Sequence, residues 1–118
     1  MRLAPAMEPL TIEGIQHIGL YCRDIKRTSQ WYQEILGCTV VEEDPFHVTL
    51  TLGRQQIALF EAAVDSLIQG GLHHIGLQVA TGKRSSFERT LDLYGVRLHD
   101  FGPHKGFQDP DGHWLHLI

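Results

Sequence analysis

Residues 16–20 read Gln-His-Ile-Gly-Leu, and residues 73–77 read His-His-Ile-Gly-Leu. The rest of the chain repeats in the same order and at nearly the same offset. Self-similarity at a fixed period is the signature of a repeated structural unit. The further echoes pair Leu36–Val40 with Tyr94–Leu98 and Ile57–Leu59 with Leu115–Leu117. We therefore expect two copies of one module.

The first module is expected to contain a strand, a helix and three more strands. Asp24 is a good N-cap because its carboxylate can accept backbone N–H groups that the first helical turn leaves unpaired. Gly37 can end the helix, since glycine adopts the left-handed conformation without a steric penalty. The expected elements are a strand over 15–22, a helix from Asp24 to about Leu36, and strands over 38–43, 46–52 and 55–61.

The second module is expected to repeat this order. Asp109-Pro110-Asp111-Gly112 suits a tight turn, because proline presets φ and glycine accepts a positive φ. The expected elements are a strand over 73–80, a helix over about 83–94 ending at Gly95, and strands over 96–100, 105–108 and 113–118.

The whole chain, residues 1–118, is expected to form one domain. Residues 1–12 read as a frayed tail, about 13–61 as module one, 62–72 as a linker and about 73–118 as module two. A module of about fifty residues cannot bury a sufficient core alone, so the two modules should share one.

Composition limits the classes of partner and the compartment. The chain has 118 residues, 42% apolar and 20% charged, with net charge −4. A mildly acidic surface attracts neither nucleic acid nor an anionic membrane. No apolar run approaches the ~20 residues that cross a bilayer, and the first residues lack the apolar core of a signal peptide. We expect a cytoplasmic protein in which Cys22 and Cys38 are free thiols packed in a core.

Three segments resemble the vicinal oxygen chelate superfamily, which includes glyoxalase I, bleomycin-resistance proteins and extradiol dioxygenases. They are QHIGLYCRDIKRTSQWYQEILG at 16–37, GLHHIGLQV at 71–79 and GFQDPDGHWLHLI at 106–118. The resemblance implies an α+β fold, with two βαβββ modules forming a curled mixed sheet around an open cavity. It is specific for the superfamily and not for one reaction.

The resemblance also implies metal ligands on the first and last strands of each module. These four slots fall on His17, His74, His116 and, by the internal repeat, Ala58. The family usually has Glu where His116 stands, and glyoxalase I-like members have Glu where Ala58 stands. Alanine cannot ligate, and Glu61 should face the other side of its strand. The implied cofactor is a divalent metal ion, with Zn, Fe, Mn, Ni and Co all left open.

The remaining histidines are predicted to have surface or structural roles. His73 should face away from its neighbour His74, and His113 has the wrong strand parity to join His116. The others are His47, His99 and His104. Tyr21 and Trp114 share the parity of the ligand slots, so we expect them, with Ala58, to line the substrate pocket.

Two functions remain open at this stage. One is a divalent-metal-dependent enzyme of the lyase, isomerase or dioxygenase type, acting on a small molecule with vicinal oxygens. The other is a metal-free protein that binds a small molecule or antibiotic, like the bleomycin-resistance members. No catalytic side chain is identified. We also expect a homodimer, because curled sheets leave strand edges that are generally covered. Whether one chain or two form the complete cavity is left open.

Overall fold

A computed structural model describes residues 11–64 and 71–118 of the chain. Most of the expected tail, and residues 65–70 of the expected linker, lie outside these ranges. No helix within them is long and apolar enough to span a membrane.

The first module forms a four-stranded mixed sheet and one helix. Its strand order is β1-β4-β3-β2; β1 runs parallel to β4, and the other neighbours are antiparallel. Its elements are β1 (His17–Cys22), α1 (Ile25–Leu36), β2 (Val40–Glu43), β3 (His47–Leu52) and β4 (Gln55–Glu61).

The second module repeats this topology with shorter strands. Its order is β5-β8-β7-β6, again with the first strand parallel to the last. Its elements are β5 (Ile75–Leu77), α2 (Arg84–Leu93), β6 (His99–Asp100), β7 (Lys105–Gln108) and β8 (Trp114–Leu117). The predicted α+β fold of two βαβββ modules is confirmed, with two separate open sheets.

Two strands of the second module are shorter than predicted by three residues or more. The strand expected over 73–80 is β5, Ile75–Leu77, because its partner β8 spans only Trp114–Leu117. The strand expected over 96–100 is β6, His99–Asp100, which pairs with only two residues of β7. A strand cannot extend beyond the ladder that satisfies its backbone groups.

The helix boundaries follow the predicted capping. Asp24 Oδ1 accepts a hydrogen bond from the Arg27 backbone N–H at 3.2 Å, which satisfies one unpaired donor of α1. Gly37 ends α1 with φ at 70°. α2 has Tyr94 as its C-cap, and Gly95, one residue later, has the same positive φ of 70°.

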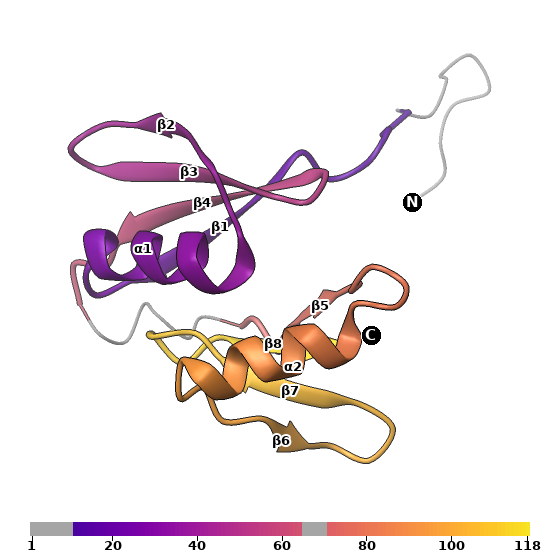
Figure 1. Ribbon diagram of the computed structural model, residues 1–118. Coiled ribbons are helices and arrows are strands. Elements are labelled where there is room, and N and C mark those ends of the chain that lie inside the picture. Colours follow the sequence, from indigo (N-terminus) through magenta and orange to yellow (C-terminus); the bar gives the residue numbers. More distant parts are fainter. Residues whose placement is uncertain (1–10, 65–70) are drawn as a thin grey trace.

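One hydrophobic core lies between the two sheets. Leu59 of β4 and Leu115 of β8 belong to the same buried cluster. The Phe107 ring, on β7, lies 6.1 Å from the Trp31 ring of α1 and 5.9 Å from the Phe87 ring of α2. Figure 1 shows α1 on the side of the first sheet that faces the second module. Each sheet therefore turns one face towards a common core and its other face away from it.

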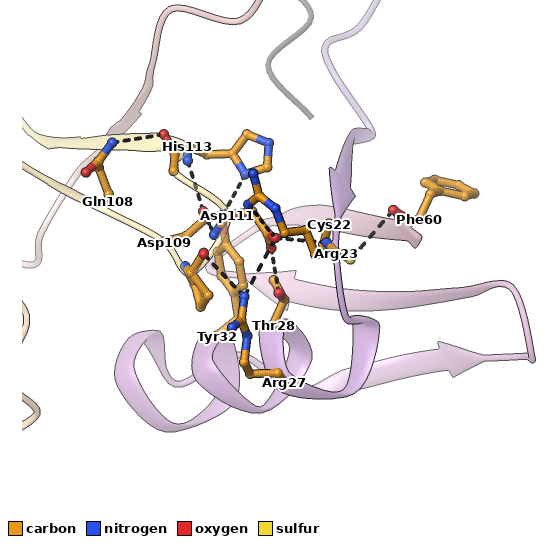
Figure 2. Close-up of polar contacts among 12 residues, drawn as sticks. Cys22, Arg23, Arg27, Thr28, Tyr32, Phe60, Gln108, Asp109, Asp111 and His113 are labelled. Carbon is orange, nitrogen blue, oxygen red and sulfur yellow. Dashed lines mark hydrogen bonds and ion pairs between the residues drawn. The ribbon is translucent and has the colours of Figure 1, made fainter. Parts of the chain in front are cut away.

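Two buried carboxylates join the modules (Figure 2). Asp111, in the turn between β7 and β8, accepts hydrogen bonds from the Thr28 hydroxyl at 2.6 Å and the Arg23 backbone N–H at 2.8 Å. Asp109 accepts one from the Tyr32 hydroxyl at 2.7 Å. The Asp109 carboxylate is also hydrogen-bonded to the His113 ring Nδ1 at 2.8 Å, a contact within its own turn. Both carboxylates are fully buried, so these contacts fix α1 against the second module.

Candidate metal centre

The strand register places three predicted site residues on the outer face of the first sheet, away from the core. His17 lies beside Gln56, Gly19 beside Ala58, and Tyr21 beside Phe60. Alternate residues of a strand share a face, so the side chains of His17, Ala58 and Tyr21 lie on one side. Glu61 lies beside Cys22, whose side chain is buried in the core. Glu61 is therefore on the core side, as predicted.

The outer face of the second sheet carries the other slots. His116 lies between Gly76 of β5 and Gly106 of β7. In the first sheet Gly19 lies beside Ala58, so Ala58 and His116 occupy equivalent register positions. His17 and His74 each precede their glycine by two residues.

Two of the three predicted ligands lie together. The His74 and His116 rings stack with centroids 4.0 Å apart and planes 6° from parallel. The lone pair of an imidazole nitrogen lies in the ring plane, so two nearly parallel stacked rings cannot both direct a lone pair at one ion, and binding an ion requires one ring to rotate. His74 is exposed and has room to rotate.

His17 is not part of this cluster. It lies on the other sheet, and both outer faces point away from the common core. Within residues 11–64 and 71–118, no three side chains of His, Cys, Asp or Glu are grouped so that they could hold a metal ion. A single copy of the described chain thus brings two imidazoles together and leaves the third apart.

The His116 imidazole is held in a defined position. Phe101 stacks on it with centroids 5.0 Å apart, and Trp114 lies nearly perpendicular to it at 6.4 Å. Beneath the ring is Gly106, where an added Cβ would come within 2.8 Å of His116 Cδ2. The sheet therefore makes room for an imidazole by omitting a side chain.

The protonation of His116 suits a ligand. Burial lowers its pKa below the usual value, and the neighbouring charges of His74, His73 and His104 lower it further. Its side chain is 8% exposed. A neutral imidazole is the form that binds a metal ion.

In both His17 and His74, the ring Nδ1 contacts the side chain of the preceding residue. His17 Nδ1 is hydrogen-bonded to Gln16 Oε1, and His74 Nδ1 lies 2.8 Å from His73 Nδ1. The prediction that His73 faces away from His74 is wrong. Strand geometry starts only at Ile75, so the alternation of faces does not apply to these two residues.

The predicted pocket residues do not line the cavity that opens between the modules. Tyr21 is 43% exposed on the outer face, and Ala58 is buried there. Trp114 lies between His99 and Phe101, 5.1 and 5.0 Å from their ring centroids. A cavity of about 1070 Å³ does open between the modules, but Tyr21, Ala58 and Trp114 are not among its lining residues.

Two other histidines have structural partners. His113 is buried against Asp109, away from His116, as its strand parity predicted. The His47 Nδ1 contacts Asp44 Oδ2 at 2.7 Å, and its ring stacks on Phe60 at 5.4 Å.

Four residues around the candidate centre were not predicted from the sequence. They are Gln16, Gln56, Phe101 and Gly106. Only Gly106 left a signal: a glycine inside a strand often marks the close approach of another group.

Comparison with known proteins identifies relatives of this fold. Residues 14–92 match the family described as the Glyoxalase/Bleomycin resistance protein/Dioxygenase superfamily. No curated protein matches the sequence.

Solved structures of the same fold cover nearly the whole chain. The genomically encoded fosfomycin resistance protein FosX from Listeria monocytogenes has 20% identity and a TM-score of 0.78, over 91% of this chain and 91% of that chain. A variant of it, complexed with Mn(II) and 1S,2S-dihydroxypropylphosphonic acid, has 22% identity and a TM-score of 0.76, over 91% of this chain and 90% of that one. An integron cassette protein from the mobile metagenome of Halifax Harbour Sewage Outfall has 23% identity and a TM-score of 0.74, over 90% and 97%.

Proposed function

The chain belongs to the glyoxalase/bleomycin resistance protein/dioxygenase superfamily, and we propose that it is a divalent-metal-dependent enzyme acting on a small molecule with vicinal oxygens. The observation that carries this proposal is the pair His74 and His116 on the outer face of the second sheet. His116 is buried, its pKa is lowered, and the sheet leaves a gap for its ring at Gly106. A histidine with only a surface role requires neither burial, nor a lowered pKa, nor a glycine beneath its ring.

The third ligand is proposed to be His17 of the partner subunit in a homodimer. The common core and the contacts of Asp109 and Asp111 hold the two modules of one chain with their outer faces apart. In the described chain, β1 pairs only with β4, and β5 pairs only with β8. These free edges suit pairing with a second copy, because unpaired backbone groups favour another strand.

The donor set fits a divalent ion. Three imidazoles suit Zn, Fe, Co or Ni, whereas Mn is better served by carboxylate oxygens. Ala58 supplies no donor, so one position stays open for water or a substrate oxygen. When bound, such an ion stabilises negative charge on oxygen as a Lewis acid. Tyr21 and Trp114 share the outer faces of the ligands and are proposed to form the walls of the pocket.

Elemental analysis of the purified protein tests this function. After incubation with Zn, Fe(II), Mn, Ni and Co in turn, we expect about one ion per chain with Zn, Fe(II), Ni or Co and less with Mn, as a three-imidazole site with one open position predicts. His116→Ala should remove most of the uptake. His47→Ala is the matched control, because His47 is held by Asp44 and Phe60 on the first sheet. No uptake of any of these ions by the wild type would leave the metal-free binding protein as the function.

A further inference from the structure

Both the nitrogen and the oxygen of the Gln16 side-chain amide make hydrogen bonds. Its Nε2 donates a hydrogen bond to Gln56 Oε1 at 3.0 Å, and its Oε1 is bonded to His17 Nδ1. Gln16 directly precedes β1, and Gln56 is the residue of β4 that lies beside His17. The parallel pairing of β1 with β4 therefore brings the two amides and the imidazole into one chain of hydrogen bonds.

This chain of hydrogen bonds determines which nitrogen of His17 carries the proton. An amide oxygen only accepts and an amide NH2 only donates. Because the Gln16 NH2 donates to Gln56, the Gln16 oxygen faces the imidazole, and His17 Nδ1 must be the donor. A neutral imidazole carries one N–H, so His17 Nε2 keeps its lone pair and faces no partner in this network.

In the second module, a different type of residue contacts the equivalent atom, which is Nδ1 of His74. His73 stands where Gln16 stands in the repeat, and its Nδ1 lies 2.8 Å from His74 Nδ1. His17 and His74 are therefore both contacted at Nδ1 by the preceding residue. Two unrelated side chains at the equivalent position thus each contact Nδ1 of the histidine that follows, which argues for a shared requirement.

We propose that Gln16 and Gln56 are positioning residues that hold His17 as the Nδ1–H tautomer, with Nε2 free to bind the metal ion; this rests on the metal site proposed above. A partner that accepts the second ring N–H of a ligating histidine fixes its tautomer and its ring orientation. Such partners do not touch the ion. Their removal lowers affinity because an imidazole in the wrong tautomer must move its proton before it can bind.

The first test uses metal-free protein and needs no substrate. Long-range proton–nitrogen correlation spectra of labelled protein, at a pH where imidazole is neutral, report which ring nitrogen of His17 carries the proton. We expect Nδ1–H in the wild type. Gln16→Leu should lose this preference, and Gln16→Glu should keep it, because a carboxylate oxygen still accepts from Nδ1.

The second test measures metal affinity by competition with a chelator. Gln16→Leu and Gln56→Leu should each weaken Zn binding by about 10- to 100-fold, the usual effect of removing an outer partner of a ligand. Gln16→Glu should restore the affinity. Gln55→Leu is the matched control, because Gln55 lies next to Gln56 on β4, beside Leu52, and takes no part in these hydrogen bonds.

The outcomes separate this inference from the proposed function. An Nε2–H tautomer in wild-type His17, which a reversed Gln16 amide would produce, overturns the inference. Unchanged tautomer and unchanged Zn affinity in Gln16→Leu also overturn it. A wild type that shows the Nδ1–H tautomer but takes up no metal supports the hydrogen-bond assignment and refutes the metal function.

Discussion

Gly106 is the residue on which the position of the His116 ring depends most directly. A Cβ at this position would lie 2.8 Å from His116 Cδ2 and 3.1 Å from Phe101 Cε2. Gly106→Ala should therefore displace the imidazole, and overpacking of this kind costs about 1–3 kcal/mol. We expect a lower urea midpoint and weaker metal binding. Gly19→Ala is the control on the first sheet, because its Cβ would only touch Phe60 at 3.5 Å. Equal effects of the two substitutions would contradict this account.

The two cysteines are predicted to be unreactive in the folded protein. Burial, with the charge of Asp111 next in importance, raises the pKa of Cys22 to about 12. Burial raises the pKa of Cys38 to about 11. The thiolate is the nucleophile, and a raised pKa keeps each thiol protonated at all pH values well below it. A chromogenic thiol reagent at pH 8 should find no fast-reacting group in native protein and two after unfolding. Rapid labelling of the native protein would refute this prediction.

At the scale of elements, the turn between β7 and β8 also joins the second module to α1 of the first. Tyr32 of α1 donates its hydroxyl proton to Asp109 at 2.7 Å, and burial together with that carboxylate raises the pKa of Tyr32 well above its usual value. Tyr32→Phe keeps the ring and removes this bond to a charged acceptor, which is worth about 1.5–3 kcal/mol. Urea unfolding should show a loss of that size.

Tyr21→Phe provides the matched comparison. The Tyr21 side chain is 43% exposed on the outer face of the first sheet, so loss of its hydroxyl should change stability by no more than about 0.5 kcal/mol. If Tyr21→Phe destabilised the protein as much as Tyr32→Phe, the contact between α1 and the turn would not be what joins the modules.

The elements were predictable from the sequence where local chemistry determines them. Asp24 and Gly37 mark the two ends of α1 as expected, since capping depends only on neighbouring residues. The length of β5 was not predictable, because it depends on how far its partner β8 extends. The sequence predicted Asp109–Gly112 as a turn, but its partners Thr28 and Tyr32 lie about eighty positions away, and nothing local indicates them.

At the scale of the whole molecule, the internal repeat predicted on which face of its sheet each site residue lies. It did not predict how the two sheets are placed relative to each other. Strand parity and the repeat put His17 and Ala58 on one outer face and His116 on the other. Whether these faces meet depends on how the modules pack, and the sequence does not carry that information locally. The common core turns the faces apart, so the proposed site needs two chains.

Complementation between two inactive variants tests this shared site most directly. His17→Ala and His116→Ala chains should each take up almost no metal alone. When unfolded together and refolded, they should regain about a quarter of the wild-type uptake per chain, because random pairing makes half of the dimers mixed and each mixed dimer has one intact site. Sedimentation should show the wild type as a dimer. A mixture that binds no more metal than the separate variants, or a monomeric wild type that binds one ion per chain, would contradict a site shared between two copies.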